Sequence, residues 1–143
     1  MNTLKQFFTA GLLATFMVSS LVPVAFADSV SGSNPGTPDL KITISPNKII
    51  EHQDVSFVVA TVDGSDISTG LSNYDLGFQI ISASGANKIK AAVSVGVNNT
   101  YTVVDNGSSY RITVNVDEND VLDTSSIQLP VGTYTFKFGD TNN

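Results

Sequence analysis

Carboxylate and amide side chains gather in one short segment ahead of the last predicted strand. The segment begins at Asp117 and runs to Asp123. Ca²⁺ binds six to eight oxygen ligands, and carboxylate and amide oxygens are suitable ones. The candidate metal ligands are Asp117, Asn119, Asp120 and Asp123. The spacing does not match the EF-hand pattern, because Val121 stands at the third ligand position and no glycine follows it.

A capped turn of helix is the second interpretation of this acidic segment. Asn119 or Asp120 would be the N-cap of a turn that starts at Val121, since their side chains can accept hydrogen bonds from the free N–H groups of a first helical turn. Acidic residues also stabilise the N-terminus of a helix. This interpretation predicts that the protein has no cofactor, and calcium is the alternative.

Other groupings of catalytic residues are missing from the sequence. His52 is the only histidine and the chain has no cysteine, so a zinc site is not expected. No Gly-x-Ser-x-Gly motif marks a nucleophilic serine. The acidic residues are expected mostly in turns, whereas glycoside hydrolysis needs two carboxyl groups that face each other across a cleft. We therefore predict that the protein is not an enzyme.

Aromatic side chains are the remaining candidates for ligand contact, because flat rings can stack on sugar rings. Most of them are in phase with alternating apolar runs, so the core is the expected place for most of the set. The set comprises Phe57, Phe78, Phe136, Phe138, Tyr74, Tyr101, Tyr110 and Tyr134.

The first residues have the pattern of a secretory signal peptide. Lys5 is the only charged residue before Asp28, the Phe7–Val22 run is mostly apolar, and Ala25–Ala27 supplies small residues ahead of a cleavage point. The apolar run is shorter than the ~20 residues that a membrane-spanning helix needs. We predict that residues 1–27 are removed, that no membrane contact follows, and that the apolar run is not a retained anchor.

Charge and composition predict one acidic domain behind a flexible leader. The 143 residues include 13 acidic residues against 7 Lys and Arg, for a formal net charge of −6. The basic residues are scattered, so nucleic acid is not an expected partner. Residues 28–38 are rich in Ser, Gly and Pro, with Val30 as their one apolar residue, which predicts a flexible leader. Residues 39–143 are expected to fold as a single domain.

Hydrophobic residues alternate along most of this domain, which predicts an all-β fold. The expected strands are 40–45, 54–62, 74–81, 88–97, 99–105, 109–116 and 132–139. Residues 64–73 are expected to form a polar loop. About seven short strands with frequent turn signals are typical of a β-sandwich. The lack of cysteine fits an exported bacterial protein better than an animal one.

Two local predictions follow from the strand pattern. Asn106-Gly107 separates two alternating runs and predicts a tight type I′ hairpin, because both residues tolerate positive φ. Residues in phase with apolar neighbours are expected in the core. The predicted core residues are Phe57, Phe78, Ile112, Val114, Tyr134 and Phe136.

The C-terminal third contains a series of short motifs. They are Tyr101-Thr102-Val103-Val104, Asn106-Gly107, Tyr110–Val114 and Leu129–Phe138. The series resembles the X2-type Ig-like module of bacterial surface and cellulosome proteins. Two features depart from that family: Val121-Leu122 stands where it has a Tyr-Leu pair, and the link at 123–128 is longer. The resemblance implies an Ig-like Greek-key β-sandwich that assists attachment to polysaccharide or to the cell surface.

These observations predict a secreted, non-catalytic binding module, extracellular or associated with the cell surface. Its expected partner is a polysaccharide, the cell wall or another surface protein. The alternative is a structural subunit of an extracellular fibre or matrix. Residues 28–38 argue against that alternative, because a leader with one apolar residue is poorly suited to act as a donated strand.

Overall fold

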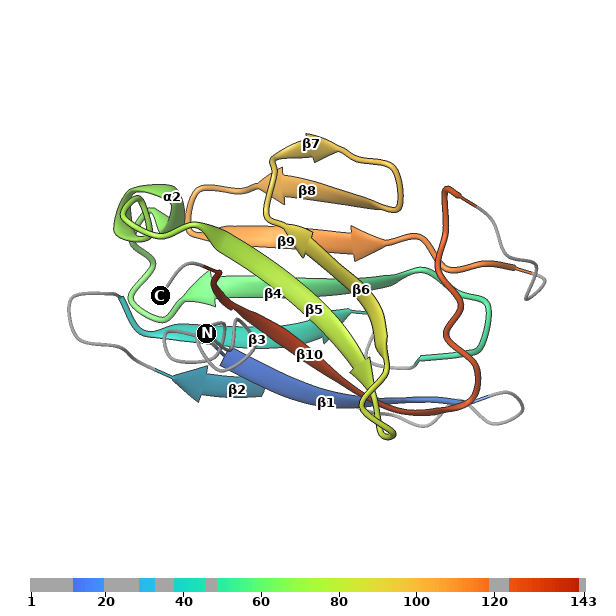
Figure 1. Cartoon of the computed structure of the whole chain (residues 1–143). Coiled ribbons are helices and arrows are strands. Elements are labelled where there is room, and N and C mark those ends of the chain that lie inside the picture. Colours follow the sequence, from blue (N-terminus) through green and yellow to red (C-terminus); the bar gives the residue numbers. More distant parts are fainter. Residues whose placement is uncertain (1–11, 20–28, 33–37, 46–48, 119–123, 142–143) are drawn as a thin grey trace.

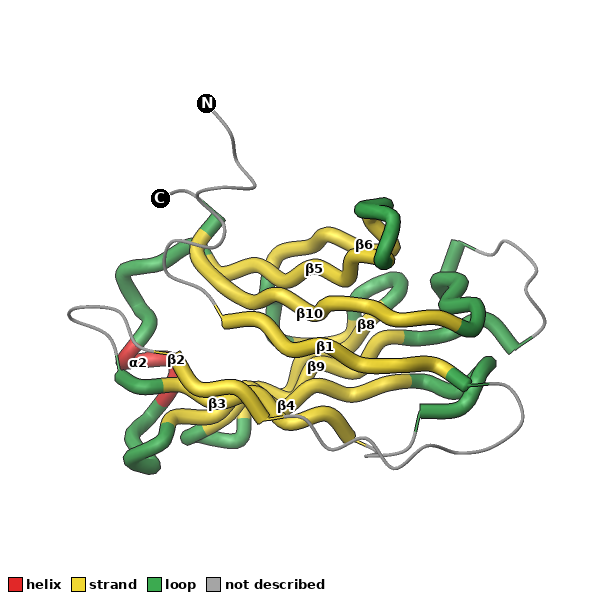
Figure 2. The backbone as a smooth tube through the Cα atoms, turned by 90° about the horizontal axis from the view of Figure 1, so that it is seen from below, coloured by secondary structure: helices red, strands yellow, loops and turns green. Residues whose placement is uncertain are grey.

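Two antiparallel β-sheets packed face to face make up the protein (Figures 1 and 2). The computed structural model describes residues 12–19, 29–32, 38–45, 49–118 and 124–141. The four-stranded sheet has the order β1 (Leu12–Val18), β10 (Gly132–Asp140), β5 (Leu76–Ser82), β6 (Asn87–Ala92). The six-stranded sheet has the order β2 (Ser29–Gly32), β3 (Leu40–Ser45), β4 (Val55–Thr61), β9 (Ser109–Val114), β8 (Tyr101–Asp105), β7 (Gly96–Val97). The all-β sandwich prediction is confirmed.

The alternation of residues along each strand determines which side chains enter the core. In β4, Val55, Phe57 and Val59 are buried, while Ser56 and Val58 on the opposite face are partly exposed. The strands predicted from this alternation agree with β3, β4, β5, β8, β9 and β10 to within about two residues, the usual spread of strand boundaries. The predicted core residues Phe57, Phe78, Ile112, Val114, Tyr134 and Phe136 are all buried.

Aromatic rings join the two sheets across the core. Phe57 of β4 and Phe136 of β10 stack with ring centroids 3.9 Å apart and planes at 7°. Phe78 of β5 packs edge-on against Tyr101 of β8, with centroids 4.9 Å apart. Such pairs add stabilisation beyond the burial of their area. The centre of the sandwich is therefore held by contacts between residues distant in sequence.

The β8–β9 hairpin forms where it was predicted, but with a different turn. Asn106 N–H donates to the Ser109 carbonyl at 2.8 Å, and Gly107 has φ of 87°. A type I′ turn needs positive φ at both central residues, whereas Asn106 does not have it. The type I′ prediction is therefore wrong, and Gly107 alone supplies the positive φ.

The expected strand 88–97 is divided between the two sheets. β6 ends at Ala92, and Gly96, with φ of 121°, begins β7 in the other sheet. Val95 and Val97, which were expected in phase with the strand's other apolar residues, are 60% and 88% exposed. The alternation of apolar residues predicted a longer strand, because this pattern carries no information about the change of backbone direction before Gly96.

Three further elements lie where the sequence pattern predicted none. The polar loop 64–73 contains a one-turn helix, α2 (Ile67–Gly70), which begins because Asp66 caps it. Residues 29–32 of the predicted leader form β2, which pairs with β3. Residues 12–18 of the predicted signal peptide form β1, which pairs with β10 (Figure 2). Among the described residues, no helix has the length and apolar character to span a membrane.

Candidate functional site

The acidic segment that holds the candidate calcium ligands is described only at its start. Asn119, Asp120 and Asp123 lie outside the described residues. Asp117 is half-buried, and its backbone N–H donates to the Ile127 carbonyl at 2.8 Å. Within the described residues, no group of three or more acidic or histidine side chains could hold a metal ion. The calcium site therefore stays a prediction.

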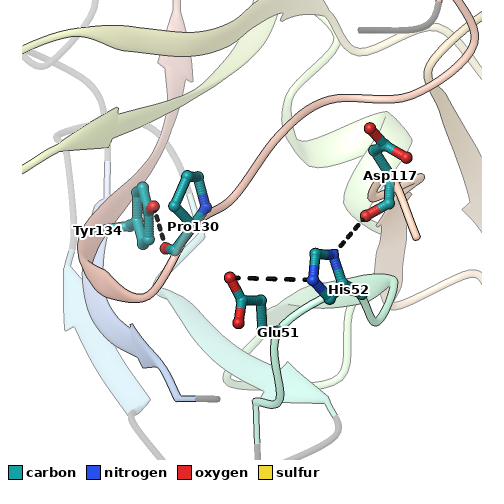
Figure 3. A network of polar contacts seen from close by, with 5 residues as sticks. All are labelled: Glu51, His52, Asp117, Pro130 and Tyr134. Atoms are coloured by element: carbon teal, nitrogen blue, oxygen red, sulfur yellow. Dashed lines mark hydrogen bonds and ion pairs between the residues drawn. The ribbon is translucent and has the colours of Figure 1, made fainter. Parts of the chain in front are cut away.

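The ring of His52 is hydrogen-bonded to the start of this segment. Its Nδ1–H donates to the Asp117 carbonyl at 2.9 Å, and its Nε2 lies 3.9 Å from Glu51 Oε1 (Figure 3). His52 has φ of 67°, a left-handed conformation that costs free energy for a residue with a Cβ. The carboxylate of Asp54 in the same turn accepts the Val116 N–H at 2.8 Å. The turn at 51–54 is therefore joined to residues 116–117 by two hydrogen bonds, one through His52 and one through Asp54.

The aromatic residues lie mainly in the core, as predicted. Phe57, Phe78, Phe136, Phe138, Tyr101, Tyr110 and Tyr134 are buried, and Tyr74 is half-buried. Because these rings are buried, they cannot form a flat surface row for sugars. Tyr74 is the one member of the candidate set with a partly accessible ring, and it borders a cleft.

This cleft lies beside α2, where β5 starts and β6 ends. Figure 1 shows where these elements lie in the sandwich. Its volume is about 540 Å³, within the ~300–1,000 Å³ range of small-molecule sites. The residues around its mouth and walls include Ser68, Ser72, Tyr74, Asp75, Leu76 and Thr141. Serine, threonine and aspartate residues therefore line the same open cleft as Tyr74.

Local hydrogen bonds fix the walls of the cleft. Asp66 accepts the Thr69 N–H at 2.8 Å and the Ser68 hydroxyl at 2.7 Å, which holds the helical wall. Thr141 donates its N–H and its hydroxyl to the Asp75 carbonyl at 2.8 and 2.9 Å, which ties the end of β10 to the start of β5. The walls of the cleft are therefore held by the Asp66 cap of α2 and by the hydrogen bonds from Thr141 to Asp75.

Two titratable groups at or near the cleft have shifted pKa values. Hydrogen bonds from the Thr69 N–H and the Ser68 hydroxyl hold the pKa of Asp66, the cap of α2, below its ordinary value. Burial, together with the charges of Asp105 and Asp66, raises the pKa of Tyr110 in the cleft wall.

Sequence reasoning missed this cleft apart from Tyr74. Ser68 and Ser72 belong to the expected loop 64–73, Asp75 belongs to the expected strand 74–81, and Thr141 lies beyond the last expected strand. Asp66 followed by Ile67 was the available signal, since an N-cap residue before an apolar one marks a helix start. Comparison with models of protein families, with curated proteins and with solved structures finds no match.

Proposed function

We propose that the chain is an exported, non-catalytic Ig-like module that binds polysaccharide in the cleft beside α2. Removal of residues 1–27 on export would leave an extracellular or cell-surface protein. The observation that carries the proposal is that the half-buried Tyr74 lines the same cleft as the polar residues Ser72 and Asp75. A sugar presents C–H groups on its faces, which pack on an aromatic ring, and hydroxyls at its edge, which hydrogen-bond to such polar groups.

The strand order supports an Ig-like assignment. An Ig constant-type sandwich has one sheet in the order A-B-E-D and a second that contains C-F-G. The order β3-β4-β9-β8 corresponds to A-B-E-D, and the adjacent pair β5-β10 corresponds to C-F. The connections between these strands then follow the Greek-key path.

A hydrogen bond at the start of β10 supports the same assignment independently. The Tyr134 hydroxyl donates to the Pro130 carbonyl, four residues upstream (Figure 3). Ig-like domains have a tyrosine near the start of strand F whose hydroxyl bonds to the upstream backbone in this way. Tyr134 therefore supports the alignment of β10 with strand F.

Retention on insoluble polysaccharide tests the proposed function. The exported protein, recovered from the culture medium, is mixed with cellulose, chitin or peptidoglycan and sedimented. We expect retention on at least one of them, with loss of most binding in Tyr74→Ala and little loss in Tyr74→Phe, which keeps the ring. Val104→Ala, an exposed position on β8 outside the cleft lining, is the matched control. No retention on any of the three, or equal retention of Tyr74→Ala, contradicts the proposal.

A structural subunit of a fibre or matrix is the second candidate, and one observation favours it. β10 has a neighbouring strand, β1, that belongs to the segment predicted to be removed. An exported chain without that strand would present an open sheet edge, which can pair with another chain. Light scattering of the exported protein tests self-assembly, and a monomer at high concentration excludes it.

A further inference from the structure

The position occupied by β1 is the last strand position of the proposed Ig-like arrangement. The four-stranded sheet runs β1-β10-β5-β6, so β1 lies beside the strand that corresponds to F (Figure 2). In an Ig-like sheet that neighbour is strand G. β1 is also antiparallel to β10, over the register from Leu12↔Phe138 to Val18↔Gly132. An N-terminal segment therefore fills a position that strand G occupies in an Ig-like sandwich.

The side chains of β1 fit this position as core residues. Leu12, Ala14, Phe16 and Val18 are buried, whereas Leu13 and Met17 on the other face are 48% and 39% exposed. Phe16 packs edge-on against Phe57 with centroids 5.3 Å apart and stacks on Tyr134 at 5.6 Å. The position beside β10 therefore accepts a strand with apolar residues at alternate positions. The residues that stand between these apolar positions can vary.

Backbone hydrogen bonds beyond β1 connect the same segment to the link between β3 and β4. Ser19 N–H donates to the Ile49 carbonyl at 3.3 Å, and Glu51 N–H donates to the Ser19 carbonyl at 2.8 Å. The strand consequently closes the gap between β10 and the link that leads into β4. Its removal would uncover one side of the core as well as a sheet edge.

The residues of β1 are also the apolar centre of the predicted signal peptide. The inference rests on the export step of the proposed function, because cleavage before Asp28 removes β1 from the mature chain. The Phe57 and Tyr134 rings would then lose Phe16, and β10 would lose the partner for one of its edges. Exposed apolar surface and unpaired backbone groups both favour the addition of a new strand.

We propose that release of residues 1–27 opens a strand-accepting groove beside β10, and that its occupant is an extended apolar segment of another exported polypeptide. The occupant runs antiparallel to β10 and carries apolar residues at four alternate positions, with an aromatic ring at the third. In the uncleaved chain, residues 12–18 occupy this groove.

The mature chain itself offers no suitable occupant in its leader. Residues 28–38 contain one apolar residue, Val30, and that residue belongs to β2, which already pairs with β3. The far edge of the same sheet is a poor acceptor, because β6 carries Lys88 and Lys90 and charged residues protect a sheet edge from pairing. The groove beside β10 is therefore the accepting edge of this sheet.

A peptide added in trans tests the proposal without altering the protein. The probe is a synthetic peptide of residues 11–19, with a lysine tag for solubility, added to the exported protein recovered from medium. We expect saturable binding, measured by fluorescence anisotropy, and a melting temperature that rises with peptide concentration, since a ligand of the folded state stabilises it. The uncleaved precursor should bind the peptide much more weakly, because its own β1 fills the groove.

Two variant peptides supply matched controls. Phe16→Asp puts a charge at a buried position, so binding should fall on the order of tenfold or more. Leu13→Asp puts the same charge at an exposed position, so binding should stay within about threefold of the parent, since exposed substitutions have small effects. Equal binding of both variants, or no binding of the parent peptide, overturns the proposal.

The exported protein's N-terminus and its Tyr74→Ala variant separate this proposal from the previous one. Mass spectrometry should show a chain that begins at Asp28, and a chain that retains β1 would overturn the open groove. Tyr74→Ala should leave peptide binding unchanged, because Tyr74 precedes β5 and does not lie at the edge of β10 that pairs with β1. Failure of polysaccharide retention with peptide binding intact would contradict the cleft alone.

Discussion

Phe16 of β1 stacks on Tyr134 of β10, with ring centroids 5.6 Å apart and planes at 27°. Tyr134 also donates its hydroxyl to the Pro130 carbonyl, so one side chain joins the strand interface to the corner that precedes β10 (Figure 3). A segment at the start of the chain and a corner near its end consequently meet at one ring. The proposed removal of residues 1–27 would break this contact and take a packing partner from the last strand.

Truncation of Phe136 should destabilise the fold strongly. Phe136→Ala removes the stack on Phe57 and leaves a cavity between the sheets, which typically costs roughly 3–5 kcal/mol. The measurement is chemical or thermal unfolding followed by circular dichroism. Thr133→Ala, an exposed position on the same strand, is the control and should have a small effect. A melting temperature for Phe136→Ala within a degree or two of the parent would show that the placement of β10 is wrong.

Removal of the Tyr134 hydroxyl should have a smaller effect. Tyr134→Phe keeps the ring stack but leaves the Pro130 carbonyl without its donor, for a loss of about 1 kcal/mol in the free energy of unfolding. Denaturant unfolding measures the loss, with Tyr74→Phe as the comparison. An unchanged midpoint for Tyr134→Phe would remove the corner from the support for an Ig-like assignment.

The sequence pattern predicted most of the core but not the edges. Phe57, Phe78 and Phe136 could be assigned to the core because burial on one face imposes a period of two. The cleft could not be predicted, because it depends on Thr141 meeting Asp75, two residues that are far apart in the chain. The alternation within residues 12–18 was hidden in a continuous apolar run, which is equally typical of a signal peptide.

High pH should destabilise the folded protein. Burial raises the pKa of Tyr101, Tyr110 and Tyr134 above the ordinary value of about 10, with help from Glu51 at Tyr134. Their protonated forms are therefore favoured in the folded state, and this contribution is fully present below pH ~10. It is lost as the pH rises through the higher folded-state pKa values. Tyrosine absorbance against pH, with stability measured in parallel, should show late titration that accompanies unfolding, and titration of all tyrosines near pH 10 without loss of stability would contradict the assignment.

Calcium should not stabilise the protein specifically. If the acidic segment is a capped turn, then Ca²⁺ and Mg²⁺ have the same small screening effect on the melting temperature of the exported protein. If Asp117, Asn119, Asp120 and Asp123 bind calcium instead, then Ca²⁺ at a hundredfold excess over its Kd stabilises the fold by about 2.7 kcal/mol. Melting in Ca²⁺, Mg²⁺ and chelator separates the two. A calcium-specific rise of about five degrees or more that Asp120→Ala abolishes would establish the metal site.

Hydrogen exchange along β10 tests most directly whether this strand needs a partner from outside the mature domain. In the precursor, β10 lies between β1 and β5, so its amides should be protected on both edges. In the exported protein, we predict fast exchange for the β10 amides that face the vacated edge, while those bonded to β5 stay protected. Addition of the residue 11–19 peptide should restore slow exchange at the fast set. Equal protection of β10 in the precursor and in the exported protein without peptide would contradict the strand-accepting groove.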